Sequence, residues 1–321
     1  MKTFAFIFFP QNIKQLGCFL PWTKIIPSFF LKSRLKNVSP LRIVRIPKIR
    51  STQNKVIQGY FILCPLIPQS EAGLDEAAVS ERLTAAVDIA KELEVDILGL
   101  DINLSGIAKN TYILEARFAV PLASGHIMTA WSLFETVYRI ARIKNMPLKD
   151  SVLSVMGQIG PIGALCVNRL SAFAPKIIFE VTHKDKPEFT QAINEADIVI
   201  NLNGAEDFLP GIIKEFKAGA VICDICFSKG TINKLNLLRK DITVIRSGLI
   251  KLPFPVGMGV NLGLPEGIVP APVAETMLMA FADKTPGCFL SEDKNPDKLE
   301  ELADIAVQHG FQVWVPEAPV L

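Results

Sequence analysis

The sequence has few of the residues that build metal centres and disulfide frameworks. It holds three histidines and six cysteines in 321 residues, and the cysteines are scattered. Scattered thiols are typical of a reducing compartment, so we expect a cytoplasmic protein. Cys223 and Cys226 have C-x-x-C spacing, but Cys223 falls inside an apolar strand and no second pair has metal-ligand spacing. We therefore predict no metal site.

Long hydrophobic runs are also missing. Half of the residues are hydrophobic, yet no run approaches the ~18 apolar residues of a membrane span. Residues 1–10 hold a short apolar run with no Ala-x-Ala cleavage site after it, which favours a core strand over a cleaved leader.

Acidic residues are absent from the first 70 positions, which hold 11 Lys and Arg. The remainder carries 23 basic and 32 acidic residues, so the N-terminal part is a cationic module. A solvated basic face would explain it. The alternatives are docking of an acidic protein, an anionic substrate or peripheral contact with a membrane surface. We expect no nucleic-acid partner.

The central motif is a glycine-rich stretch, residues 151–163, with the spacing G-x-x-G-x-x-G. A buried strand at 152–156 precedes it, and a helix containing Ala164 follows, which is the context of a dinucleotide-binding loop. The first glycine would allow a sharp exit from the strand, the second close approach of backbone amides to a pyrophosphate, and the third close packing of the helix. A purely structural turn is the alternative. The candidate cofactor-binding residues are Gly157, Gln158, Ile159, Gly160, Pro161, Ile162 and Gly163.

Short apolar strands then alternate with helical or turn segments, which predicts a parallel sheet whose ligands bind beyond the carboxyl ends of the strands. These strands are 177–181, 198–201, 220–224 and 242–246. Glu180 lies about 20 residues beyond the loop and would favour NAD through the ribose, whereas its neighbours could hold the 2′-phosphate of NADP. The candidates after the strands are Glu180, Thr182, His183, Lys184, Asn203, Gly204, Ser247 and Gly248.

The pattern of apolar residues in the N-terminal part predicts a separate mixed α/β domain. We expect a strand at 3–9, a hairpin of 41–49 and 56–64, a helix at 75–94 and a strand at 96–102. Pro47 indicates an edge position or a bulge. The expected fold class is α/β: a Rossmann-like parallel sheet domain with a separate N-terminal mixed α/β domain. The expected boundaries are 1–125 for the N-terminal domain, 126–145 for a connecting helix, 146–283 for the Rossmann-like domain and 284–321 for a C-terminal helix and strand that pack back.

Three further residues are candidates for chemistry. His126 follows Ser124 and Gly125 and precedes Thr129, at the start of the helix that leads to the nucleotide-binding domain. Lys229 follows the strand that ends at Asp224. A hydrogen-bonded structural histidine and a solvated turn lysine are the alternatives. The Gly- and Pro-rich passage 252–272 is predicted to be a loop across the mouth of the cleft, followed by a helix at 273–281.

Taken together, these motifs resemble the long-chain acyl-[acyl-carrier-protein] reductases, Rossmann-type enzymes that form fatty aldehydes. The resemblance spans most of the chain and rests on the order of residues 56–60, 124–130, 157–163, Asp224 with 228–229, 271–279 and 309–311. It implies an NADPH cofactor, an acyl thioester substrate and an acidic acyl carrier protein that docks on the basic N-terminal domain. In that family a cysteine attacks the thioester and hydride then reduces the enzyme-bound acyl group.

The chain departs from this pattern at the expected nucleophile. Pro272 stands where the family has cysteine, and His126 stands where it has asparagine. Three outcomes follow: Cys226 substitutes as the thiol, hydride reaches a bound carbonyl directly with Lys229 as oxyanion stabiliser or proton donor, or the reaction is lost. The sequence thus predicts an NAD(P)H-dependent reductase of an acyl thioester or related carbonyl. The alternatives are a catalytically silent NAD(P)-binding sensor or docking protein, and a small-metabolite dehydrogenase of the same fold.

Overall fold

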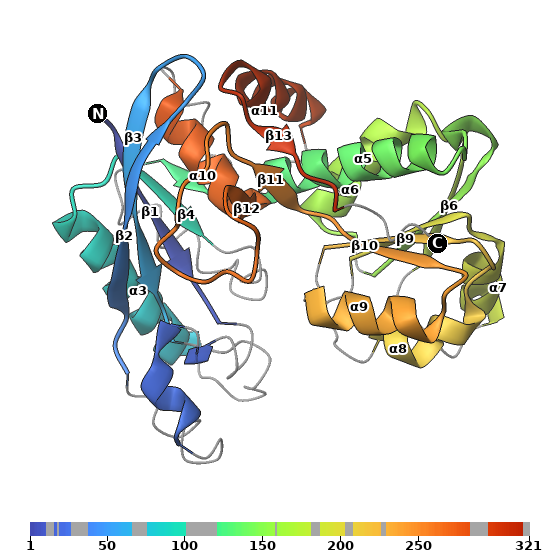
Figure 1. The fold of residues 1–321 in the computed structure, drawn as a ribbon, viewed down its shortest axis with the longest axis horizontal. Coiled ribbons are helices and arrows are strands. Elements are labelled where there is room, and N and C mark those ends of the chain that lie inside the picture. Colours follow the sequence, from blue (N-terminus) through green and yellow to red (C-terminus); the bar gives the residue numbers. More distant parts are fainter. Residues whose placement is uncertain are drawn as a thin grey trace. The chain divides into compact units, whose positions relative to one another are not determined.

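The structure is a computed structural model that describes residues 1–10, 16–17, 19–26, 38–65, 76–100, 121–157, 159–180, 187–202, 208–225, 229–282 and 295–316. The chain divides into two compact units (Figure 1). The first comprises Met1–His126, Leu252–Asp293 and Asp304–Gln312, and the second comprises Ile127–Lys251, Lys294–Ala303 and Val313–Leu321. This division differs from the boundary at 283 expected from the sequence, because the chain returns to the first unit at Leu252.

A five-stranded sheet forms the centre of the first unit. Its strands, in the spatial order β2-β3-β1-β4-β5, are β2 (Leu41–Arg50), β3 (Val56–Leu63), β1 (Thr3–Phe8), β4 (Ile97–Leu100) and β5 (Leu122–Ala123). The β2–β3 pair is antiparallel, which confirms the predicted hairpin, and the other pairs are parallel. Pro47 lies on the edge strand β2, at a register shift between Ile46 and Ile49. Its lack of an N–H therefore costs no hydrogen bond between the strands.

Helices cover both faces of this sheet. The helix α3 (Glu76–Glu92) packs through Leu83 and Ala86 onto the side chains of Ala5 and Ile7. Because side chains alternate along a strand, Phe6 points to the other face, which α10 (Ala271–Phe281) covers. All eleven residues of α10 are buried.

The segment before α10 corrects two predictions. The helix begins at Ala271 rather than at 273, and β12 (Ile268–Pro270) lies inside the passage that was expected to be loop. Pro272 occupies the first turn of α10, where a missing N–H costs no intrahelical hydrogen bond. A short 3-10 helix, η1 (Pro21–Lys24), also belongs to this unit.

The second unit is built on a five-stranded parallel sheet. Its order, β10-β9-β8-β6-β7, becomes 2-1-3-4-5 when the strands are numbered along the chain within this unit, which is the order of a doubly wound α/β sheet. The predicted α/β fold class is therefore confirmed. The strands are β6 (Val152–Met156), β7 (Lys176–Glu180), β8 (Ile198–Asn201), β9 (Val221–Asp224) and β10 (Thr243–Arg246).

Two hydrophobic clusters show that helices cover both faces of this sheet. Val155 faces α5 and α6, where Leu133 and Leu170 are buried with it. Met156 faces the opposite way, into the cluster formed by α7, α8 and α9. The unit thus has three layers. The helices are α5 (His126–Ile143), whose first residue belongs to the first unit, α6 (Pro161–Ser171), α7 (Pro187–Glu195), α8 (Phe208–Ile212) and α9 (Lys229–Leu238).

The remaining elements are short 3-10 turns and the C-terminal segment. In the second unit η4 (Leu148–Asp150) precedes β6, and η5 (Ile213–Glu215) follows α8. The strand β11 (Leu249–Lys251) ends the segment Ile127–Lys251 of this unit. The helix α11 (Pro296–Gln308) and the strand β13 (Gln312–Val313) are the helix and strand predicted for the C-terminal segment 284–321. Both contain residues of each unit.

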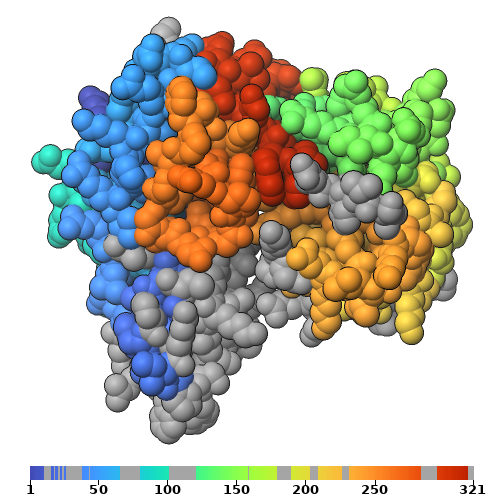
Figure 2. Space-filling view, viewed as in Figure 1, coloured from blue at the N-terminus to red at the C-terminus, as the bar shows by residue number. Residues whose placement is uncertain are grey.

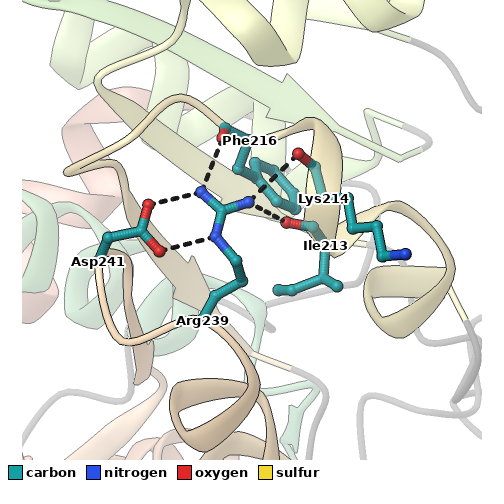
Figure 3. A network of polar contacts seen from close by, with 5 residues as sticks. All are labelled: Ile213, Lys214, Phe216, Arg239 and Asp241. Carbon is teal, nitrogen blue, oxygen red and sulfur yellow. Dashed lines mark hydrogen bonds and ion pairs between the residues drawn. The ribbon is translucent and has the colours of Figure 1, made fainter.

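Arg239, just after α9, joins the turn before β10 to the η5 region before β9 (Figure 3). Its guanidinium donates to both carboxylate oxygens of Asp241, at 2.7 and 2.6 Å, and to three carbonyls of the η5 region. The hydrogen bond from Arg239 lowers the pKa of the Asp241 carboxyl. The carbonyls belong to Ile213, Lys214 and Phe216, at 2.9, 3.2 and 3.2 Å.

Candidate functional site

Two of the three glycines of the 157–163 loop have the structural role that the sequence predicts. Gly157 has φ +106°, which L side chains rarely adopt, so the sharp exit from β6 is confirmed. A Cβ atom at Gly163 would stand 2.7 Å from Leu202 Cδ1 and 3.4 Å from Ile159 Cγ2, so glycine allows α6 to pack closely. A Cβ atom at Gly160 would meet no atom of the described residues within 4 Å. As far as these residues go, the middle of the loop borders open space.

The loop leads into the N-terminus of α6 with Gly160 as the N-cap. Among the described residues no side chain caps this end, and no acidic residue lies in the first turn. The first intrahelical bond runs from the Ala164 amide to the Gly160 carbonyl, at 2.9 Å. The amides of Ile162 and Gly163 precede that bond and have no intrahelical acceptor, and the helix dipole adds a partial positive charge there. This end of α6 is suited to an anion.

The glycine loop lies at the point where the strand order of the sheet reverses. From β6 the chain goes to β7 on one side, and from β8, on the other side of β6, it goes to β9, so the connections after β6 and β8 diverge. Met156 and Asn201 are register partners at the ends of these strands. In doubly wound sheets the ligand crevice forms at such a switch point.

A polar row continues along the same edge. Asn201, Asp224 and Arg246 are in register at the ends of β8, β9 and β10. The Asn201 side-chain amide donates to Asp224 Oδ1 at 2.6 Å, and both residues are fully buried. Burial lowers the pKa of the Arg246 guanidinium, and the negative charge of Asp224 acts in the opposite direction. Sequence reasoning missed Arg246, although a charged residue at the end of an apolar strand was the available signal.

The structure places further predicted site residues at or near this edge, some of them through their backbone alone. Glu180 ends β7 as the register partner of Met156, and Lys229 begins α9, but nothing is described of either side chain. Ser247 is buried after β10, and a Cβ atom at Gly248 would stand 4.0 Å from Thr129 Cγ2, which places Thr129 near this connection. The predicted residues outside the described part of the chain are Gln158, Thr182, His183, Lys184, Asn203, Gly204 and Cys226.

The first unit contains a second group of predicted residues. Gly125 has φ +77°, and a Cβ atom on it would lie 2.5 Å from Pro272 Cα. The Gly125 amide donates to Glu275 Oε1 at 2.8 Å, inside the protein. Ser124 Oγ and His126 Nδ1 are hydrogen-bonded, and His126 is buried. The structure thus brings together Gly125, His126 and Pro272, while Thr129 belongs to the second unit.

The buried thiols of the second unit are poor nucleophiles. Burial, together with the nearby Asp224 carboxylate, raises the pKa of Cys223 to about 12. Burial likewise raises the pKa of Cys166. Among the described residues no group of three or more His, Cys, Asp or Glu side chains is placed to hold a metal ion. Within the same residues no helix combines the length and apolar character needed to cross a bilayer.

The second unit is therefore a doubly wound α/β domain with a glycine-rich loop at the switch point of its sheet. No protein-family model matches the chain. A curated relative is "Aminotransferase PigE" of Serratia sp. (strain ATCC 39006), 21% identical over 303 residues. The match covers 88% of this chain and 35% of that protein, so the chain spans about a third of the relative's length.

The solved structures similar to this chain include several dehydrogenases. NAD-dependent malic enzyme from Thermotoga maritima is 12% identical with a TM-score of 0.42, over 97% of this chain and 85% of that one. A 5,10-methylenetetrahydrofolate dehydrogenase from the silkworm Bombyx mori is 13% identical with a TM-score of 0.42, over 87% and 86%. A 3-phosphoglycerate dehydrogenase from Entamoeba histolytica with bound NAD+ is 10% identical with a TM-score of 0.33, over 77% and 80%. The fold assignment itself rests on the strand order described above.

Proposed function

We propose that this protein is an NAD(P)H-dependent oxidoreductase that binds its dinucleotide at the glycine loop of the second unit. The observation that carries the proposal is the loop itself. Gly157 turns the chain sharply out of β6, at the switch point of a parallel sheet. Among the described residues none crowds Gly160, and no side chain caps the N-terminus of α6 that follows.

The loop residues would have separate tasks in holding the cofactor. The amides of Ile162 and Gly163 would donate to the pyrophosphate, and the absence of acidic residues from the first turn of α6 avoids repulsion there. Pro161 fixes the first helical residue and removes an N–H that would otherwise need an acceptor. The choice between NAD and NADP would fall to Glu180, Thr182, His183 and Lys184. When bound, a reduced nicotinamide supplies hydride.

The proposed substrate is an acyl thioester or a related carbonyl compound. The resemblance to acyl-[acyl-carrier-protein] reductases motivates it, and the contact between Gly125 and Pro272 supports it, because two matching positions far apart in sequence meet. Proline has no nucleophilic atom, so direct reduction is favoured. The acyl carbon would take a hydride, the carbon–sulfur bond would break, and the thiol would leave with a proton to give a fatty aldehyde. Candidate proton donors are Lys229, His126 and Thr129, with Cys226 as the thiol of a covalent route.

An acidic acyl carrier protein is the proposed partner. The edge strand β2 presents four exposed cationic side chains, Arg42, Arg45, Lys48 and Arg50. Figure 2 draws this part of the sequence in blue. Arg45 also donates to Gln58 on the neighbouring strand at 2.6 Å. Such docking would weaken steeply between low salt and ~0.3 M salt. Binding that did not respond to salt would contradict it. The buried thiols Cys64, Cys166 and Cys223 fit a reducing, cytoplasmic location.

Loss of the family's nucleophile favours one alternative, a silent nucleotide sensor. A titration of the protein with NADPH and NADH by calorimetry, on the wild type and Gly160→Asp, tests the nucleotide site. Gly257→Asp is the matched control, because a Cβ atom there also meets none of the described atoms within 4 Å. We expect Gly160→Asp alone to lose binding, since its carboxylate would repel the phosphates.

Turnover then separates the alternatives. Consumption of reduced cofactor with an acyl-carrier-protein thioester, together with aldehyde formation, supports the reductase. Binding without turnover of any acyl or carbonyl substrate supports the sensor, and turnover of a small carbonyl compound alone supports a metabolite dehydrogenase. Failure of the wild type to bind either cofactor would refute all three.

A further inference from the structure

The second unit contains a cavity that the nucleotide site does not use. Its volume is about 650 Å³, within the range of small-molecule sites. It is formed by the end of α5, by η4 and by Phe173 just after α6. Because η4 runs directly into the start of β6, the cavity lies at the amino end of that strand, and Gly157 lies at its carboxyl end. We infer that this cavity is a binding site for an amphipathic anion, a carboxylate carried on a flat aromatic body.

An aromatic cluster forms the apolar wall of the cavity. The rings of Tyr138 and Phe173 are 5.7 Å apart, edge to face, and both pack on Phe134, at 6.1 and 5.8 Å. Phe173 remains 38% exposed, although its side chain is large and apolar. The wall is therefore held in place by its own packing and still offers a ring surface to a ligand. Met146 adds an adaptable side chain beside it.

Two cations line the same cavity, and among the described residues no acidic side chain does. Arg142 comes from the last turn of α5 and Lys149 from η4. Neither forms an ion pair with the part of the chain that the structure describes. The arginine shares one helix face with Tyr138, because the two are four residues apart. A planar guanidinium next to an aromatic ring suits a carboxylate attached to a flat body.

The end of α5 leaves these charges available. Asn145 has φ +53°, and its amide donates to the Arg142 carbonyl at 3.2 Å, while the Met146 amide donates to the Ala141 carbonyl at 2.8 Å. This pair of bonds is the Schellman arrangement that satisfies the last carbonyls of a helix. The carbonyl ends therefore already have donors and compete less for the two cations than an uncapped helix end would.

Binding here would be independent of the proposed cofactor site. Five residues of β6, about 17 Å of extended strand, separate the cavity from the glycine loop. A ligand in the cavity would therefore not displace a dinucleotide. The inference also stands if the glycine loop binds nothing, because none of the cavity residues belongs to that loop.

The test is calorimetric titration of the full chain with 2-naphthoate, with 2-naphthamide as a neutral probe of the same shape. We expect the acid to bind and the amide to bind at least tenfold more weakly. Arg142→Gln and Lys149→Gln should each weaken the binding of 2-naphthoate about tenfold, and added salt should weaken it in the wild type. Lys144→Gln, which removes a charge from the same helix end outside the cavity, should bind as the wild type does.

A second variant separates a missing site from a misfolded protein. Phe173→Ala removes a half-exposed ring, so the far-ultraviolet circular dichroism should be unchanged while binding weakens. Equal affinity for acid and amide, or unchanged affinity in both Arg142→Gln and Lys149→Gln, would overturn the inference. So would a wild-type Kd above about 1 mM, which would leave no more than weak surface association.

Discussion

Gly125 and Pro272 are in backbone contact, since a Cβ atom added to Gly125 would stand 2.5 Å from Pro272 Cα. Gly125 also has φ +77°, so an added side chain meets both strain and a clash. We expect Gly125→Ala to lower the free energy of unfolding by about 2–4 kcal/mol. Urea denaturation followed by circular dichroism measures this. Gly257→Ala is the control, because its surroundings are open, and equal stability of the two variants would contradict the contact.

The buried pair of Asn201 and Asp224 predicts a charge-dependent defect. Asn201→Asp would set a second carboxyl 2.6 Å from Asp224 Oδ1, where two negative charges cannot both be accommodated. We expect a loss of about 3 kcal/mol or more at pH 7, with partial recovery towards pH 5 as one carboxyl holds a proton. The unfolding midpoint in urea at the two pH values reports this.

Asn261→Asp is the matched control for that substitution. Asn261 is exposed, and its side-chain oxygen accepts from the Gly263 amide at 2.8 Å, a bond that aspartate would keep. Its stability should change little between pH 7 and pH 5. A similar pH response in the two variants would show that burial of the Asn201 position is not the cause.

Asp197 links stability to acid pH. Burial would raise the pKa of its carboxyl, but hydrogen bonds from Lys217 Nζ, at 2.5 Å, and from the Val152 amide, at 2.8 Å, outweigh burial and lower it below 3.8. A lowered folded-state pKa contributes stability above the unfolded value, and that contribution is lost as the pH falls through the folded value. Asp197→Asn should therefore lose less stability than the wild type between pH 5 and pH 3.

The control for Asp197 is Asp304→Asn, an exposed carboxylate that pairs with no basic side chain of the described residues. Its stability should fall with acidification as the wild type does. An Asp197→Asn variant as acid-sensitive as the wild type would remove Asp197 from this role.

The thiols of Cys166 and Cys223 should be inert in the folded protein. Both are fully buried, and burial raises the pKa of Cys223 to about 12, so the reactive thiolate is scarce at pH 8. Labelling with iodoacetamide at pH 8, mapped by mass spectrometry, should modify neither residue until denaturant is added. Labelling of Cys223 in the folded state would show that β9 opens locally.

The sequence by itself determined most of the local elements. Two apolar, β-branched runs joined by a polar segment predicted β2 and β3, and Pro47 indicated an edge position or a bulge, because a residue without an N–H is excluded from a central strand. The roles of two loop glycines were also predicted from the sequence, since Gly157 is needed for its positive φ and Gly163 for the close packing of α6. The parallel sheet of the second unit followed from the regular alternation of strands and helices.

Only the tertiary structure decided which elements meet. Apart from Glu275 and Thr276, α10 is apolar, so its composition does not show which sheet it packs on. The sequence placed it in the Rossmann-like domain, but it packs on the sheet of the first unit. The hydrogen bond between Gly125 and Glu275 joins residues 150 positions apart, and the pairing of Asn201 with Asp224 depends on β8 lying beside β9. The periodicity of apolar residues indicates which face of a helix or strand is buried, but not which element covers that face. The contacts between distant elements are therefore decided by tertiary packing.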